Sequence, residues 1–93
     1  MTDRIEVLQD VLVLGVTVDE RATVVVDVYG SSANACGVLR VQVPDAEERR
    51  DAVGLVRHWG VTNTPLSLII QGTRVALQND HAVFQAQLQP MLP

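Results

Sequence analysis

The sequence predicts a small α/β domain in which a mixed β-sheet is packed with two helices. The chain has 93 residues, which is the size of a single domain. Hydrophobic residues make up 47% of it, and seventeen of them are valines, whose branched side chains favour strands. A strand-rich first half is followed by elements in the order β-α-β-β-α.

The first segment, residues 4–17, has features of both a strand and a helix. Its second half, Val11–Val18, is β-branched and favours a strand. Ile5 and Leu8 also fit the spacing of a helical stripe, and periodicity does not decide between the two in so short a segment. The polar residues 19–21 then predict a turn.

Residues 22–29 (ATVVVDVY) contain the clearest strand pattern in the chain. Val24, Val26 and Val28 would lie on one face, and further apolar residues lie on the other. This pattern predicts a central strand that is covered on both sides. The small residues of 30–37 (GSSANACG) are bracketed by glycines and predict a loop.

The strand predicted for residues 38–43 (VLRVQV) alternates between apolar and polar residues, so one of its faces would be exposed to solvent. A helix is predicted after Pro44, because acidic residues occupy its first turn, where the helix dipole favours them. Arg57 and His58 would lie in its last turn, and Gly60 would end it. Its apolar face is formed by Ala52, Leu55, Val56 and Trp59.

A hairpin and a second helix are predicted to complete the chain. Two short apolar runs, Leu66–Ile70 and Arg74–Gln78, flank a turn that contains glycine. Asn79 or Asp80 can then cap a final helix. The apolar face of that helix would hold Phe84, Leu88, Met91 and Leu92.

This β-α-β-β-α order, over residues 38–92, resembles the second half of a thioredoxin-like domain. The likeness is carried by the strand VLRVQV, the helix ending in HWGV, the Asn63-Thr64-Pro65 step, the hairpin LSLIIQGTRVAL and the terminal helix. The resemblance implies that Pro65 is a cis proline beside a redox site. It also implies that the backbone of Thr64 meets an extended partner.

The first half departs from that family. A redox-active member carries a CxxC motif at the start of a long helix. Here the corresponding loop reads Ala33-Asn34-Ala35-Cys36, and Gly37 leads directly into the next strand. The resemblance therefore implies a degenerate relative with a peptide-binding or single-thiol redox role.

The charged residues exclude several classes of function. The net charge is −4, and the seven basic residues are arginines scattered along the chain, so we expect no nucleic-acid partner. Without lysine there can be no Schiff base, no pyridoxal phosphate anchor and no phosphate loop of the GKS/T kind.

The sequence also predicts a protein of the cytoplasm that has no membrane partner. No apolar run approaches the roughly 18 residues that a membrane span needs. The amino terminus is acidic, unlike the basic start of a signal peptide. A single cysteine, Cys36, permits no internal disulfide, which favours a reducing compartment.

Candidate reactive groups are few and widely spaced. Cys36 is either a reactive thiol or a small packing residue, and packing is the commoner role of a free cysteine. His58, His81, Cys36 and Asp27 lack the spacing of zinc ligands, so no metal or cofactor is expected. Ser31 and Ser32 follow a strand and a glycine, but the nucleophile-elbow motif is missing.

The sequence therefore predicts a non-enzymatic protein-interaction or assembly module that pairs with a second copy or with another protein. Its valine-rich strands exceed what a small core can cover, and exposed strand edges favour association. Partner contacts are assigned to Trp59, Thr64, Pro65 and Cys36. Two alternatives are the degenerate thioredoxin-like protein and a structural component of a virus or a secretion apparatus.

Overall fold

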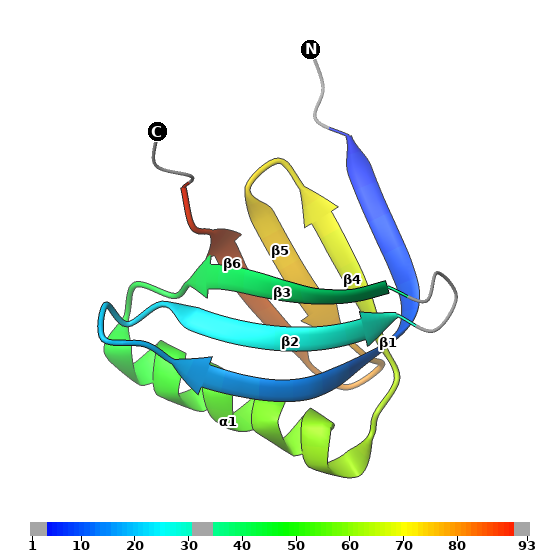
Figure 1. Ribbon diagram of the computed structural model, residues 1–93, viewed down its shortest axis with the longest axis horizontal. Helices are drawn as coiled ribbons and strands as arrows, with labels where there is room; N and C mark the ends of the chain where they lie inside the picture. Colours follow the sequence, from blue (N-terminus) through cyan, green and yellow to red (C-terminus); the bar gives the residue numbers. More distant parts are fainter. Residues whose placement is uncertain (1–3, 31–34, 91–93) are drawn as a thin grey trace.

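The chain forms a closed barrel of six antiparallel strands, with one helix packed beside it (Figure 1). The computed structural model describes residues 4–30 and 35–90. Around the barrel the strands follow the order β1-β2-β3-β6-β5-β4, and β4 pairs with β1 to close it. The elements are β1 (Ile5–Val18), β2 (Val24–Gly30), β3 (Ala35–Gln42), α1 (Ala46–Thr62), β4 (Leu66–Gln71), β5 (Arg74–Gln78) and β6 (Val83–Leu88).

The predicted α/β fold with a mixed sheet and two helices is wrong. Every neighbouring pair of strands is antiparallel, and α1 is the only helix in the described ranges. The chain therefore does not form the thioredoxin-like architecture that the β-α-β-β-α reading implied. Antiparallel neighbours need no helical crossover, so short connections join four of the five successive strand pairs and α1 alone connects β3 to β4.

β1 is the longest strand and pairs with two neighbours. Its first part, up to Val11, pairs with β4, and its second part, from Val11, pairs with β2. The register with β4 shifts between Leu8 and Val11, where Asp10 has a φ of 56°. Asp is one of the residues that tolerate this left-handed conformation. Figure 1 shows that β1 bends, and its partner changes from β4 to β2 at Val11, so that the strand leaves one side of the barrel and joins the other.

β2 and β3 follow the predicted pattern in part. Val24, Val26 and Val28 point into the core, but Asp27 is exposed, so the expected cover on both faces of β2 is absent. β3 begins at Ala35 and pairs with β2, so the predicted loop over 30–37 is shorter than expected. Its central part, residues 31–34, lies outside the described residues.

The helix after Pro44 is confirmed, with a different end. Asp45 caps it by accepting a hydrogen bond from the backbone N–H of Glu48 at 2.9 Å. The helix continues through Gly60 to Thr62 and is capped by Asn63, which has a left-handed φ of 52° and donates its backbone N–H to the Gly60 and Trp59 carbonyls. Asn serves this capping position as glycine does elsewhere.

The β4–β5 hairpin is confirmed, and the predicted terminal helix is wrong. Gly72 has a φ of 60° in the two-residue turn, where a glycine is favoured. Residues 83–88 form β6, in which Phe84, Ala86 and Leu88 face inward. The two final residues proposed for the helix face, Met91 and Leu92, lie outside the described residues.

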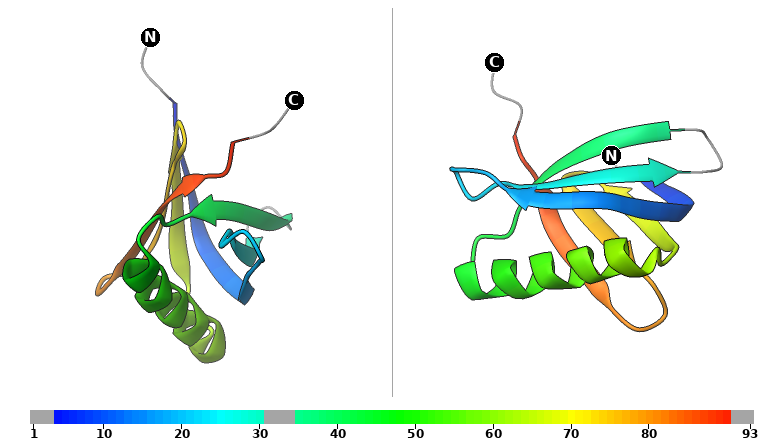
Figure 2. Two further views of the ribbon diagram at one scale, coloured as in Figure 1. Left: turned by 90° about the vertical axis from the view of Figure 1, so that its left-hand side faces the viewer. Right: turned by 60° about the horizontal axis from the view of Figure 1, so that its bottom comes forward.

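The core fills the barrel and the space between its wall and α1. Its fully buried side chains include Phe84 and Leu77 from the barrel and Val56 from the helix. Figure 2 shows α1 running along the side of the barrel beneath β1. Most valines are buried, but Val7, Val18, Val38, Val61 and Val83 are exposed. Within residues 4–30 and 35–90, no helix has the length and apolarity needed to cross a membrane.

Candidate functional site

The four residues assigned to partner contacts do not form one site. Trp59 is only 2% exposed and belongs to the core, so it presents no surface to a partner. Cys36 is exposed on β3, opposite Tyr29 of β2. Thr64 and Pro65 precede β4, and the barrel order places β1 and β2 between them and Cys36. The peptide bond before Pro65 is trans, so the cis proline implied by the resemblance is not formed.

Thr64 and Pro65 line a polar hollow of about 300 Å³ at one end of the barrel. The hydroxyl groups of Thr64 and Thr62 are hydrogen-bonded at 2.5 Å. His81 contributes to the lining, and its backbone N–H donates to the side chain of Asn79 at 2.9 Å. The hollow is shallow and polar, and it combines groups from the helix end, β1 and the β5–β6 turn.

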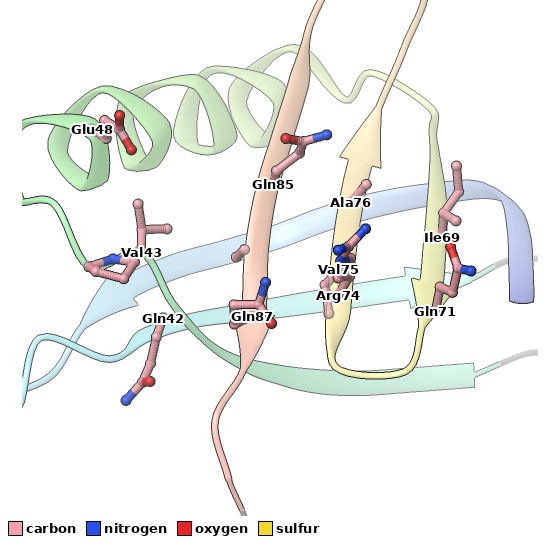
Figure 3. A pocket seen from close by; sticks show the side chains of 12 residues that line it. Gln42, Val43, Glu48, Ile69, Gln71, Arg74, Val75, Ala76, Gln85 and Gln87 are labelled. Atoms are coloured by element: carbon pink, nitrogen blue, oxygen red, sulfur yellow. The ribbon is translucent and has the colours of Figure 1, made fainter. Parts of the chain in front are cut away.

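A larger hollow of about 540 Å³ lies over the outer face of β4, β5 and β6 (Figure 3). Cross-strand pairing aligns Gln71, Arg74 and Gln87 in one row, and Ile69, Ala76 and Gln85 in the next. The Gln87 amide oxygen accepts a hydrogen bond from the Thr73 hydroxyl at 2.9 Å. The charged groups of this lining are Arg74 and Glu48. It offers amide hydrogen bonds but no nucleophile with an adjacent base.

The titratable side chains of the described residues are spread over several elements. In the part of the chain that the structure describes, no group of three or more His, Cys, Asp or Glu side chains is placed to hold a metal ion. His58 lies on α1, and His81 follows β5. Asp27 is on β2 and pairs with Val38 of β3. Ser31 and Ser32, weighed as a nucleophile turn, lie outside the described residues.

Three exposed apolar side chains lie close together at the beginning of β1, which we call the leading segment (Ile5–Gln9). Ile5 is 60% exposed, Val7 50% and Leu8 41%. Ile5 and Val7 share one face, and Leu8 lies on the opposite one, so apolar groups are uncovered on both faces. Sequence reasoning missed this site because it left the segment undecided between strand and helix.

The leading segment also has one unpaired edge among the described residues. It pairs with β4, from Ile5 opposite Gln71 to Leu8 opposite Leu68. β2 joins β1 only from Val11 onward, so the other edge of the leading segment has no strand beside it. An unpaired edge presents backbone N–H and C=O groups that another strand can bind.

Comparison with protein-family models, with curated proteins and with solved structures found no match for this chain.

Proposed function

We propose that this protein is a non-enzymatic assembly module that pairs with a second copy of itself through the leading segment of β1. The observation that supports the proposal is the coincidence of an unpaired strand edge with apolar side chains exposed on both of its faces. We also place this assembly in the cytoplasm, because a lone cysteine suits a reducing compartment.

Pairing with a second strand would provide hydrogen-bond partners for the unpaired backbone groups of the leading segment. Burial of its apolar side chains would further stabilise the dimer. A strand added to a sheet edge gains main-chain hydrogen bonds, while the flanking side chains decide which strand fits. Ile5 and Val7 would lose water-exposed apolar surface in such a pair, at about 25 cal/mol per Å² buried. The contact is short, so we expect a weak dimer whose population depends on concentration.

The charges of the segment favour one register. When two identical strands pair antiparallel about a two-fold axis, one residue lies opposite its own copy. Centring the pair on Glu6 would place two carboxylates together, and centring it on Leu8 would place Glu6 opposite Asp10. With Val7 at the centre, Arg4 lies toward Asp10 of the second copy, so opposite charges meet at both ends.

Sedimentation velocity over a range of concentrations tests the assembly. We expect the unmodified chain to shift from monomer to dimer as its concentration rises. Val7→Lys should hold it as a monomer, because a charge on an edge strand opposes edge-to-edge pairing. Val83→Lys is the matched control, since Val83 is exposed on β6, away from the leading segment. A clean monomer at every concentration would rule the proposal out.

Disulfide crosslinking tests the register separately, with Cys36→Ser as the background. Val7→Cys should form a crosslinked dimer under mild oxidation, because cysteines directly opposite each other are within disulfide reach. Ile5→Cys should not, since its two copies would be about 13 Å apart at roughly 3.3 Å per residue. Equal crosslinking at both positions would contradict the register centred on Val7.

A further inference from the structure

We propose that a pocket between α1 and the end of β1 binds a small anionic ligand, a phosphate or carboxylate compound with an apolar part. The pocket has a volume of about 320 Å³. It is lined by Val18 of β1 and by Ala46, Arg49, Arg50, Val53 and Arg57 of α1. Three arginines therefore contribute to the lining, and no acidic residue does.

The helix sequence separates its charges so that the arginines gather at this pocket. At about 100° of rotation per residue, positions 46, 50, 53 and 57 form one narrow stripe along α1. Glu47, Glu48 and Asp51 point to a different side of the helix by the same rotation. A chain with a net charge of −4 thus contains a locally positive concavity. Acidic and basic residues need not lie on different sides of α1 if their only role is to keep the helix surface soluble.

Two features prepare the pocket for an anion. Arg49 donates from Nη1 to the carbonyl oxygen of Val43 at 3.0 Å, which fixes its side chain near the start of the helix. Its remaining N–H groups are left for a ligand, because a guanidinium carries five donors in a planar fork. Arg50 and Arg57 are exposed at the rim, so they can close on an oxyanion with paired hydrogen bonds.

The apolar residues of the lining are the reason to expect that the ligand has an apolar part. Val18 is 44% exposed although it pairs with the fully buried Val24, and Val53 forms a buried apolar surface beside it. A purely inorganic ion would leave these side chains unused. The volume is near the lower limit of known ligand sites, about 300 Å³, which fits a small organic anion.

This pocket and the leading segment lie at opposite ends of β1, so the two proposals stand independently. Sedimentation velocity tests the dimer, and calorimetry tests ligand binding at a protein concentration where the chain is monomeric. A failure to form a dimer would therefore leave anion binding unaffected, and a failure to bind an anion would leave the dimer unaffected.

Isothermal titration calorimetry with phenyl phosphate and with benzoate tests the site at constant ionic strength. We expect saturable binding of at least one of the two, and the tighter of them identifies the anionic group. Arg50→Gln and Arg57→Gln should each weaken binding about tenfold or more, because each removes charge-assisted hydrogen bonds. Inorganic phosphate should bind more weakly than phenyl phosphate, since it cannot use Val18.

Arg40→Gln is the matched control, because Arg40 is an exposed arginine on the outer face of β3 and does not line the pocket. It should leave the dissociation constant unchanged. The proposal fails if neither phenyl phosphate nor benzoate binds. It also fails if Arg40→Gln weakens binding as much as Arg50→Gln, since that result would indicate general attraction to positive charge.

Discussion

Gly60 of α1 faces Val13 of β1. A Cβ placed on Gly60 would be 3.4 Å from Val13 Cγ1 and 3.5 Å from the Val13 carbonyl oxygen. The second half of the helix is therefore seated against the β1 backbone as well as against its side chains. A Cβ at Gly60 would thus make ordinary van der Waals contact with Val13, and a side chain longer than alanine would have to displace it.

A larger side chain at Gly60 should push the helix away from β1. We expect Gly60→Leu to lower the free energy of unfolding by about 1–3 kcal/mol, as overpacking in a filled core does. Urea denaturation measures the change. A variant as stable as the unmodified protein would show that α1 can shift away from Val13 without loss of packing.

Gly54, the other glycine of α1, should respond in the opposite direction. A Cβ at Gly54 would have no neighbouring atom within 4 Å, and the residue is exposed. Gly54→Ala should raise the free energy of unfolding by about 0.5–1 kcal/mol, because alanine loses less backbone entropy in a helix. The same urea titration serves both variants. A decrease for Gly54→Ala would mean that the exposed face of α1 has an unrecognised neighbour.

The sequence predicted the local elements better than their arrangement. The helix after Pro44, apart from its end, and the hairpin around Gly72 were predicted correctly because each has its own local signal, the acidic first turn and the glycine turn. The order of strands around the barrel depends on contacts between distant residues, such as Val41 opposite Leu88. No local pattern specifies these pairs.

The final helix was predicted because one set of residues satisfies two periodicities. Phe84 and Leu88 are four apart, as on a helix face, but Phe84, Ala86 and Leu88 also alternate as on a strand. Asn79, predicted with Asp80 as an alternative cap of that helix, caps no helix, because residues 83–88 form a strand. Its Oδ1 accepts the backbone N–H groups of His81 and Ala82 at 2.9 Å, and it stabilises a turn that leads into β6.

The candidate site was largely missed. Trp59 was considered as a binding anchor, yet its position on the helix face that meets the core buries it. The arginine pocket draws Val18 from β1 and Arg50 from α1, residues that are far apart in the sequence. Only the packing of the helix on the barrel brings them together. The separation of acidic and basic residues around α1 was the one sequence signal for this pocket.

Ala22 has a left-handed backbone conformation, which is unfavourable for a residue with a Cβ. In the turn between β1 and β2 it has a φ of 62°, and its N–H donates to the Asp19 carbonyl at 3.0 Å. A residue with a Cβ pays about 1 kcal/mol or more for this left-handed conformation. Ala22→Gly should therefore raise the midpoint of thermal unfolding, by several degrees for a domain of this size.

Ala52→Gly is the control for Ala22→Gly, because Ala52 is in a helix and adopts an ordinary conformation. It should lower the same midpoint, since glycine is about 1 kcal/mol less favourable than alanine in a helix interior. If Ala22→Gly also lowered the midpoint, the turn would depend on the alanine side chain in a way that its dihedral angle does not indicate.

Thr23 carries the buried hydroxyl that is least well satisfied. The residue is 1% exposed, and within the described residues its Oγ1 has no hydrogen-bond partner. Its backbone is well anchored, because its N–H donates to Asp19 Oδ1 at 3.0 Å and its carbonyl accepts from the Asp19 N–H. The side-chain hydroxyl therefore lowers the free energy of unfolding, because an unpaired buried polar group is unfavourable by about 1–3 kcal/mol.

Replacing that hydroxyl by a methyl group should stabilise the protein. Thr23→Val keeps the branched shape and removes the unsatisfied oxygen, so we expect the free energy of unfolding to rise by about 1 kcal/mol. Thr23→Ser keeps the hydroxyl and removes a buried methyl, so it should lower the same quantity by about 1 kcal/mol. Urea denaturation of both variants, with matched slopes, separates the two contributions. If Thr23→Val were as destabilising as Thr23→Ser, the hydroxyl would have to be hydrogen-bonded in solution, and its burial would support the turn instead of opposing it.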